Sequence, residues 1–352
     1  MSKASKKIIL IIIEILLYIN IGNQRAMFSK NYLKNNNFQI FNIIKLNLYD
    51  IIYKTFNKNI TYIDTLFFYG SKKIRFGNFI ISLNNAIILC EFLCCKRIIV
   101  ESFSNIYIYK KIIYSKYNLT IEPNNNNFTY NNNSLFAHAN FFFNYLNFKI
   151  LGNINRLYIF RNEILNNLPK IKINPNDLYI YARGGDIFKI ANHSSRFYAQ
   201  PPLCFYENIL YKFNFRKIRI ISEDNLNPIV LKLLEKYNYI KYNKNSIKLD
   251  ISYLANSYNI VSGKSSYIVS IIKLNDNLKF LWEYDLYILS ERYKHLHYSV
   301  YSFSFNYIIY RMNVSKRYEK LMFPFMNSEN QKRAMINEKC DINFIIIPPR
   351  IS

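Results

Sequence analysis

The chain has 352 residues, 51% hydrophobic and 20% charged, so it is long and apolar enough for two domains with cores and is not a disordered protein. Its formal net charge of +25 favours contact with polyanions of any kind. The basic residues are not gathered into an arginine-rich arm, a zinc finger or an aromatic RNA-binding motif, which favours a solvated lysine-rich surface and no nucleic-acid partner.

The N-terminus combines basic residues with a short apolar run. Three lysines among the first seven residues precede the run Ile8–Ile21, which is shorter than the ~20 residues of a bilayer-spanning helix. This pattern is typical of a secretory signal peptide or a short signal anchor, and a buried N-terminal helix or strand is the alternative. We expect residues 1–25 to be this targeting segment and residues 26–60 a stem. The protein would then be secreted, or lie in the Golgi or ER membrane with a single span.

Residues 61–168 are predicted to form a first Rossmann-like domain. Apolar residues at spacings of three and four predict a helix over Asn78–Cys95, followed directly by a strand at Arg97–Val100. Gly77 and Asn78 stand where this helix begins, because glycine permits close backbone approach and asparagine caps helices. The apolar stripe consists of Phe79, Leu83, Ile87, Cys90 and Cys94.

From residue 170 onward, apolar strands alternate with helices. The predicted strands are Leu178–Ala182, Ile218–Ile221, Tyr239–Tyr242 and Tyr258–Val261. The predicted helices are Pro202–Tyr211, Pro228–Tyr237, Ile251–Ser257 with Asp250 as its cap, and Tyr267–Lys273. Strand–helix units in series predict a parallel sheet, whose ligands bind beyond the carboxyl ends of the strands. We expect residues 169–290 to form this domain and residues 291–352 a C-terminal extension.

Three of the expected strand ends carry polar clusters. They are Arg183-Gly184-Gly185-Asp186, Ser222-Glu223-Asp224 and Lys264-Ser265-Ser266-Tyr267. A guanidinium offers planar, charged donors to phosphate, glycines let backbone N–H groups approach phosphate oxygens, and hydroxyls at a helix N-terminus complete an anion site. Taken singly, the clusters also fit a plain turn, a solvated loop and a serine N-cap. Their convergence at one edge predicts a nucleoside-diphosphate site.

Histidine and cysteine add less. His193 lies between the arginine loop and Pro201-Pro202, where it is a candidate base for an acceptor hydroxyl or a loop residue making a local bond. The five cysteines form no pair of Cys-x-x-Cys units and no cluster with histidine. Neither a disulfide framework nor a metal site is therefore expected.

The three clusters resemble sequence motifs of a known family. The segment Tyr179–Phe188 resembles the His-x-Arg-x-Gly-Asp motif of α1,2- and α1,6-type fucosyltransferases, and Ile220–Asp224 is similar to their hydrophobic-Ser-Asp-Asp block. Leu249–Leu254 through Ser265–Tyr267 resembles their Asp-Leu…Asn-Ser-Thr-Phe segment. Further similarities are Arg75–Asn78, like their Gly-Asn, and Tyr198–Leu203, like a Gln-Pro-Pro-Leu feature of a microbial eukaryotic branch. The chain departs from the family at Tyr181 for the histidine, Gly184 for a frequent second arginine, and Glu223 for the first aspartate of the second block.

The resemblance implies an α/β, GT-B-like architecture, in which two Rossmann-like domains with parallel sheets face a cleft and the C-terminal one binds the donor. It implies inverting transfer of fucose from GDP-fucose to a glycan or glycoprotein acceptor, without cofactor or metal. Arg183 and, with it, His193 are the candidate catalytic residues. The candidate donor-binding residues are Arg183, Gly184, Gly185, Asp186, Ser222, Glu223, Asp224, Asp250, Lys264, Ser265, Ser266 and Tyr267, with Gly77 and Asn78. The alternatives are a catalytically inactive glycan- or nucleotide-sugar-binding relative, motivated by Tyr181, and a nucleic-acid binder, suggested by charge alone.

Overall fold

A computed structural model describes part of the chain, in two compact units, Met1–Ile164 and Leu165–Ser352. Both units are α/β with mainly parallel sheets, as the sequence predicts at the level of fold class. The expected targeting segment and stem lie outside the described residues, and within those residues no helix is both long and apolar enough to cross a membrane. The described residues are 64–69, positions 77, 79, 80, 83, 86, 87 and 90, and 95–100, 112–114, 119–123, 134–138, 161–189, 200–263, 265–285, 307–313, 315–340 and 343–349.

The first unit contains a five-stranded sheet in the order β3-β4-β2-β1-β5. Its strands are β1 (Thr65–Tyr69), β2 (Arg97–Val100), β3 (Ile112–Tyr114), β4 (Leu119–Pro123) and β5 (Ser134–His138). The neighbours pair in parallel except β3 with β4. The predicted strand at Arg97–Val100 is confirmed, and the described stripe residues Phe79, Leu83, Ile87 and Cys90 are helical and buried. One helix face therefore packs into the core, as the spacing predicts.

The second unit contains a seven-stranded sheet in the order β12-β11-β10-β9-β6-β7-β8. Its strands are β6 (Asp177–Tyr181), β7 (Lys217–Ile221), β8 (Ile240–Tyr242), β9 (Asn259–Ser262), β10 (Phe280–Asp285), β11 (Ile308–Asn313) and β12 (Ile345–Ile347). Strand β12 is antiparallel to β11, and every other neighbouring pair is parallel. Part of the expected C-terminal extension thus extends the sheet.

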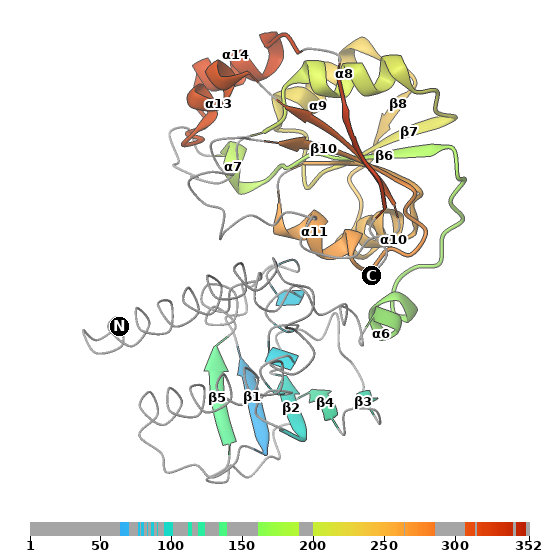
Figure 1. The fold of residues 1–352 in the computed structure, drawn as a ribbon, viewed down its shortest axis with the longest axis vertical. Coiled ribbons are helices and arrows are strands. Elements are labelled where there is room, and N and C mark those ends of the chain that lie inside the picture. The colour runs from blue at the N-terminus through green and yellow to red at the C-terminus, as the bar shows by residue number, and fades with distance from the viewer. Residues whose placement is uncertain are drawn as a thin grey trace, which may run out of the picture. The chain divides into compact units, whose positions relative to one another are not determined.

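Helices cover both faces of this second sheet. Figure 1 shows α8, α9, α13 and α14 over one face and α10 with α11 over the other. Their bounds are α7 (Asp186–Lys189), α8 (Leu203–Lys212), α9 (Pro228–Lys236), α10 (Ile247–Asn256), α11 (Ser266–Ile272), α13 (Lys316–Met322) and α14 (Glu329–Asn337), and α6 (Arg161–Asn166) precedes them. Helices α8 and α9 follow β6 and β7, and helices α10 and α11 follow β8 and β9. They cover opposite faces because the chain adds β7 and β8 on one side of β6 and then returns to β9 on the other side.

Two sequence-based expectations in this unit are wrong. Helix α10 is capped by Ser246, whose hydroxyl accepts from the Leu249 amide, so Asp250 lies inside the helix rather than before it. Ser246 and the following residues supply a complete first turn that the cap at Asp250 would have left out. The expected absence of disulfides fails as well, because Cys204 of α8 is bonded to Cys340, beyond α14.

Candidate functional site

The three polar clusters follow neighbouring strands at the centre of the seven-stranded sheet. Tyr181, the last residue of β6, is the register partner of Ile221 at the end of β7 and of Ser262 at the end of β9. Between β6 and β9 the chain changes direction across the sheet, so the connections on either side leave toward opposite faces. In open parallel sheets this switch point is where ligands bind. The clusters therefore meet at the edge where a ligand site is expected.

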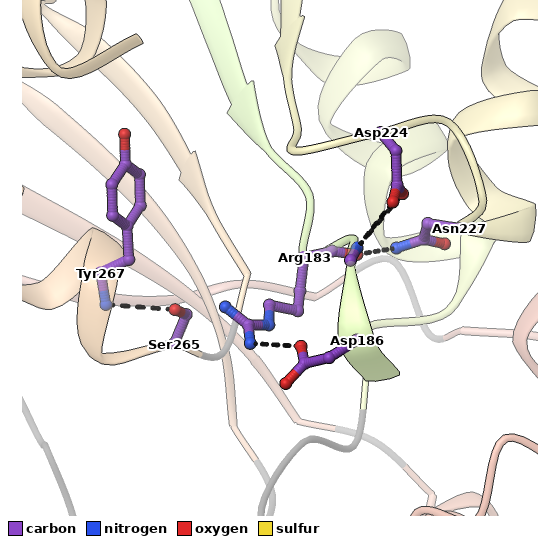
Figure 2. A network of polar contacts seen from close by, with 7 residues as sticks. Arg183, Asp186, Asp224, Asn227, Ser265 and Tyr267 are labelled. Atoms are coloured by element: carbon purple, nitrogen blue, oxygen red, sulfur yellow. Dashed lines mark hydrogen bonds and ion pairs between the residues drawn. The ribbon is translucent and has the colours of Figure 1, made fainter. Parts of the chain in front are cut away.

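Arg183 is the buried cation of this edge. Its Nη2 lies 2.9 Å from Oδ1 of Asp186, which is half exposed. Figure 2 shows the guanidinium between Asp186 and Ser265, so the Arg183 side chain, in the loop after β6, reaches toward the β9 turn. The backbone carbonyl of Arg183 accepts from Nδ2 of Asn227 at 2.9 Å, while Oδ1 of Asn227 caps α9 at Ile229. The start of α9 therefore holds the arginine backbone.

Sequence reasoning did not single out Asn227 as a site residue. Its position directly before Pro228 was the available signal, because asparagine is a preferred N-cap and proline a preferred first helical residue. The sequence does not predict the second bond of this side chain, in which Nδ2 of Asn227 donates to the carbonyl of Arg183, 44 residues earlier.

The two glycines after Arg183 let the β6 and β7 loops touch. A Cβ at Gly184 would lie 2.8 Å from Oγ of Ser222 and 2.8 Å from Oδ1 of Asp224, so a side chain there would require these groups to move. Gly185 has φ +72° and its added Cβ would strike the Glu223 carboxylate. Close contact between the two loops therefore depends on glycine at both positions.

Asp224 has a role within the loops. Its Oδ1 and Oδ2 lie 3.2 and 3.1 Å from the amide nitrogen of Gly185, and Oδ1 also accepts from the Leu226 amide at 3.2 Å. These bonds join the loop after β7 to the arginine loop. Ser222 is buried, and its Oγ makes no hydrogen bond to any residue that the structure describes. Asp224 thus fixes the backbone beside Arg183. The Ser222 hydroxyl donates no hydrogen bond to the described residues.

The β9 turn closes the other side of the edge. The amide of Gly263 donates to the carbonyl of Tyr181 at 3.0 Å. Oγ of Ser265 accepts from the Tyr267 amide at 3.1 Å and caps α11, which begins at Ser266. Ser265 therefore caps α11 and places the N-terminus of this helix beside Arg183 (Figure 2).

Tyr181, the last residue of β6, is buried beside Arg183 and Ser265. Burial raises the pKa of its phenol above the ordinary value, against the opposing charge of Arg183 and hydrogen bonds with Ser265 and Arg183. Its ring centroid lies 5.4 Å from that of Tyr267. Because the pKa is raised, the phenol is neutral at physiological pH and links the arginine to the β9 turn without serving as a base.

Asp250 lies at the same edge, on the first turns of α10. Burial raises the pKa of its carboxyl to about 6, although a hydrogen bond from Nδ2 of Asn245 at 2.9 Å and the charge of Arg219 lower it. Burial, followed by the charges of Asp224 and Asp250, raises the pKa of Tyr242 at the end of β8. The Asp250 carboxyl is therefore within electrostatic range of Arg219 in β7 and of Tyr242, the last residue of β8.

Of the four remaining candidates, only Gly77 belongs to the described residues. Gly77 is a buried helical residue of the first unit, and Asn78, His193 and Lys264 lie outside the described residues. Within the described part of the chain, no three or more His, Cys, Asp or Glu side chains gather as metal ligands do.

Taken together, the edge offers a buried guanidinium, the N-terminus of α11 and a buried serine hydroxyl, while the carboxylates of Asp186 and Asp224 bond to the guanidinium and to the Gly185 amide. Positive charge, N–H donors and closely approaching backbone are the features of an anion site, and phosphate is the common biological anion with this geometry. Comparison of the chain with protein-family models, curated proteins and solved structures finds no match in any of the three.

Proposed function

We propose that the protein is a glycosyltransferase that binds a nucleoside-diphosphate sugar at the carboxyl edge of β6, β7 and β9. The observation that carries the proposal is the convergence of the three clusters on Arg183 at the switch point of the sheet. A buried guanidinium in a site of low dielectric stabilises developing phosphate charge more than the same group in water. The resemblance to fucosyltransferases makes GDP-fucose the expected donor and a glycan or glycoprotein the expected acceptor.

The proposed reaction places Arg183 on the leaving group. The bond between the anomeric carbon and the β-phosphate oxygen breaks, and its electron pair stays on the diphosphate. An acceptor hydroxyl oxygen attacks from the opposite face, which inverts the anomeric carbon, and its proton passes to a base. Arg183 and the N-terminus of α11 would neutralise the charge that accumulates on the diphosphate. No cofactor and no metal ion are required by this scheme.

The position of Asp250 supports a guanine nucleotide. A carboxylate accepts two hydrogen bonds side by side, which matches the adjacent N1–H and N2–H groups of guanine. Asp250 lies near the start of α10, the helix that follows β8, and we propose that a nucleotide whose diphosphate contacts Arg183 places its base there. Adenine presents no such pair of donors, and a preference for GDP over ADP is therefore expected.

The disulfide supports the expected compartment. Cys204 and Cys340 form a bond of the kind that persists in oxidising compartments such as the secretory lumen. Alkylation of the native protein, with and without prior reduction, tests this by mass spectrometry. Two additional reactive thiols should appear after reduction. Their presence before reduction would argue against the secretory assignment.

A thermal-shift panel of nucleoside diphosphates and their sugars tests the proposed function. A ligand that binds only the folded state stabilises it, by about 2.7 kcal/mol at one hundred times its Kd. GDP and GDP-fucose should raise the Tm, and ADP and UDP should raise it less. If no nucleoside diphosphate changes the Tm, the proposal is wrong.

A second candidate function has a specific observation in its favour. Tyr181 is a buried, neutral phenol at the motif position of the family's histidine, which favours a catalytically inactive relative that binds glycans or nucleotide sugars. The two candidates differ in turnover rather than in binding. GDP binding without release of GDP from any donor, across a set of glycan and glycoprotein acceptors, would select the inactive relative.

A further inference from the structure

We propose that Phe325, in the loop between α13 and α14, is a positioning residue for Arg183 and acts through helix α7. This inference rests on the proposed nucleotide site, because it assigns a function to the support of that site. Phe325 lies in the C-terminal segment of the chain, 142 residues after Arg183. Three contacts connect the two residues.

The first contacts join Arg183 to α7. Asp186, the partner of the guanidinium, is also the first residue of α7, and the Phe188 amide donates to the carbonyl of Gly185 at 3.1 Å. Helix α7 has four residues, far fewer than an isolated helix needs to be stable in water. Its position must therefore come from the packing of its two buried side chains, Ile187 and Phe188.

The next contact joins α7 to the C-terminal segment. The ring of Phe188 meets the ring of Phe325 edge to face, with centroids 5.6 Å apart and planes at 71°. Phe325 is fully buried, and both rings belong to the core between the sheet and its helices. An edge-to-face aromatic pair has a preferred geometry, so the orientation of Phe325 restricts that of Phe188.

The loop that carries Phe325 is itself held by one buried side chain. Nε2 of Gln331 donates to the carbonyls of Leu321 and Pro324, each at 2.9 Å. Oε1 of Gln331 accepts from the amides of Met326 at 2.7 Å and Ser328 at 3.4 Å. These bonds enclose the loop on both sides of Phe325. A ring attached to backbone fixed in this way provides a rigid support for α7.

The same segment also holds the chain beyond α7. Oη of Tyr318 in α13 donates to the carbonyl of Gln200 at 2.8 Å, and Cys340 is bonded to Cys204. The residues from α13 to Cys340 therefore support α7 through Phe325 and the start of α8 through Tyr318. Because a displacement of about 1 Å in a binding group costs affinity and rate, looser support of α7 should weaken phosphate binding by Arg183.

Phe325→Leu in the 352-residue chain tests the inference. The matched control is Phe213→Leu, which removes a ring from the same core where it packs at 5.1 Å on both Trp282 and Tyr310, away from α7. Two quantities are measured for each variant: the Kd for GDP by calorimetry, and the rate of amide hydrogen exchange across residues 184–189. Phe325→Leu should raise the Kd about tenfold and speed this exchange. The control should lower the Tm and change neither quantity.

Gln331→Met is a second variant that keeps the Phe325 ring and removes the bonds around its loop. It should shift both quantities in the same direction as Phe325→Leu, and it serves as the test if that variant does not fold. Wild-type exchange across residues 184–189 in both variants would overturn the inference. So would unchanged GDP affinity despite faster exchange, or an equal loss of affinity in the control. If the wild-type protein binds no nucleotide but exchange in α7 still responds to Phe325, the proposed function fails while the coupling stands.

Discussion

An arginine–aspartate pair lies at each end of strand β6. The aspartate is the buried partner in one pair and the arginine in the other. At the amino end, the Asp177 side chain is 7% exposed and Arg216 58% exposed, with bonds of 2.9 and 3.0 Å joining the guanidinium to both carboxylate oxygens. At the carboxyl end, the Arg183 side chain is 8% exposed and Asp186 49% exposed. One end thus encloses an anion and the other a cation.

This difference separates a structural pair from a candidate binding pair. Asp177 is also tied to the sheet through its backbone, whose carbonyl accepts from Nδ2 of Asn259 at 2.9 Å. An exposed arginine that covers a buried carboxylate neutralises it and leaves no site for a second anion. A buried arginine whose partner carboxylate faces solvent can instead keep that partner and bind a phosphate as well, because a guanidinium has five N–H donors.

The largest expected effect is on nucleotide affinity and comes from the two arginines. Arg183→Ala should weaken GDP binding about one-hundredfold, because it removes the buried cation that faces the diphosphate. Arg216→Ala should leave GDP binding unchanged within about twofold while lowering the free energy of unfolding by ~1–3 kcal/mol, since Asp177 loses its donors. Calorimetry and urea denaturation measure the two quantities. Equal loss of GDP affinity in both variants would erase the distinction.

The next effect compares Asp177, which is bonded to the Arg216 guanidinium, with Asp250, which accepts a hydrogen bond from the Asn245 amide. The pKa of Asp250 in the folded protein, about 6, lies above the ordinary 3.8, so protonation favours the folded state. This contribution is present below about pH 4 and is lost as the pH rises through 6. Relative to wild type, Asp250→Asn should therefore gain stability with rising pH, by about 2 kcal/mol between pH 4 and 7.5. Urea denaturation across this range checks the trend, and a constant difference would contradict it.

A smaller effect compares the two aspartates directly. Asp177→Asn should cost about 1.5 kcal/mol, because it weakens charge-assisted bonds to a buried group. Asp186→Asn should cost about 0.5 kcal/mol or less, as expected for an exposed partner. Chemical denaturation of both variants at pH 7 gives the difference. The reverse order would show that burial does not decide the strength of these pairs.

The last expected effect concerns the contact between the loops at the carboxyl end. Gly184→Ala places a Cβ against Ser222 and Asp224. The Ser222 hydroxyl can rotate away, while Asp224 is held by the Gly185 amide, so about 1 kcal/mol of stability should be lost. GDP affinity should fall a few-fold by calorimetry, because the backbone beside Arg183 shifts. A variant with wild-type affinity would show that this loop tolerates displacement.

Much of the sheet is predictable from local pattern. The strands at Arg97–Val100 and at the cores of β6, β7 and β9 follow from short apolar runs, and α9 from the cap and proline at its start. The meeting of the three clusters is predictable as well, because parallel strands place all their carboxyl ends at one edge. The start of α10 is not predictable in this way, because Ser246 and Asp250 are both good N-caps and local propensity does not rank them.

The sequence by itself therefore determined the α/β class and the edge at which the polar residues of the second unit gather, since both depend on periodicity and chain direction. Tertiary structure alone decided that Cys204 pairs with Cys340, 136 residues away, that Phe325 packs on Phe188, and that Arg183 rather than its aspartate is buried. These outcomes depend on which distant segments cover each strand end. The local pattern of residues does not predict which segments these are, because burial is a property of the packed chain.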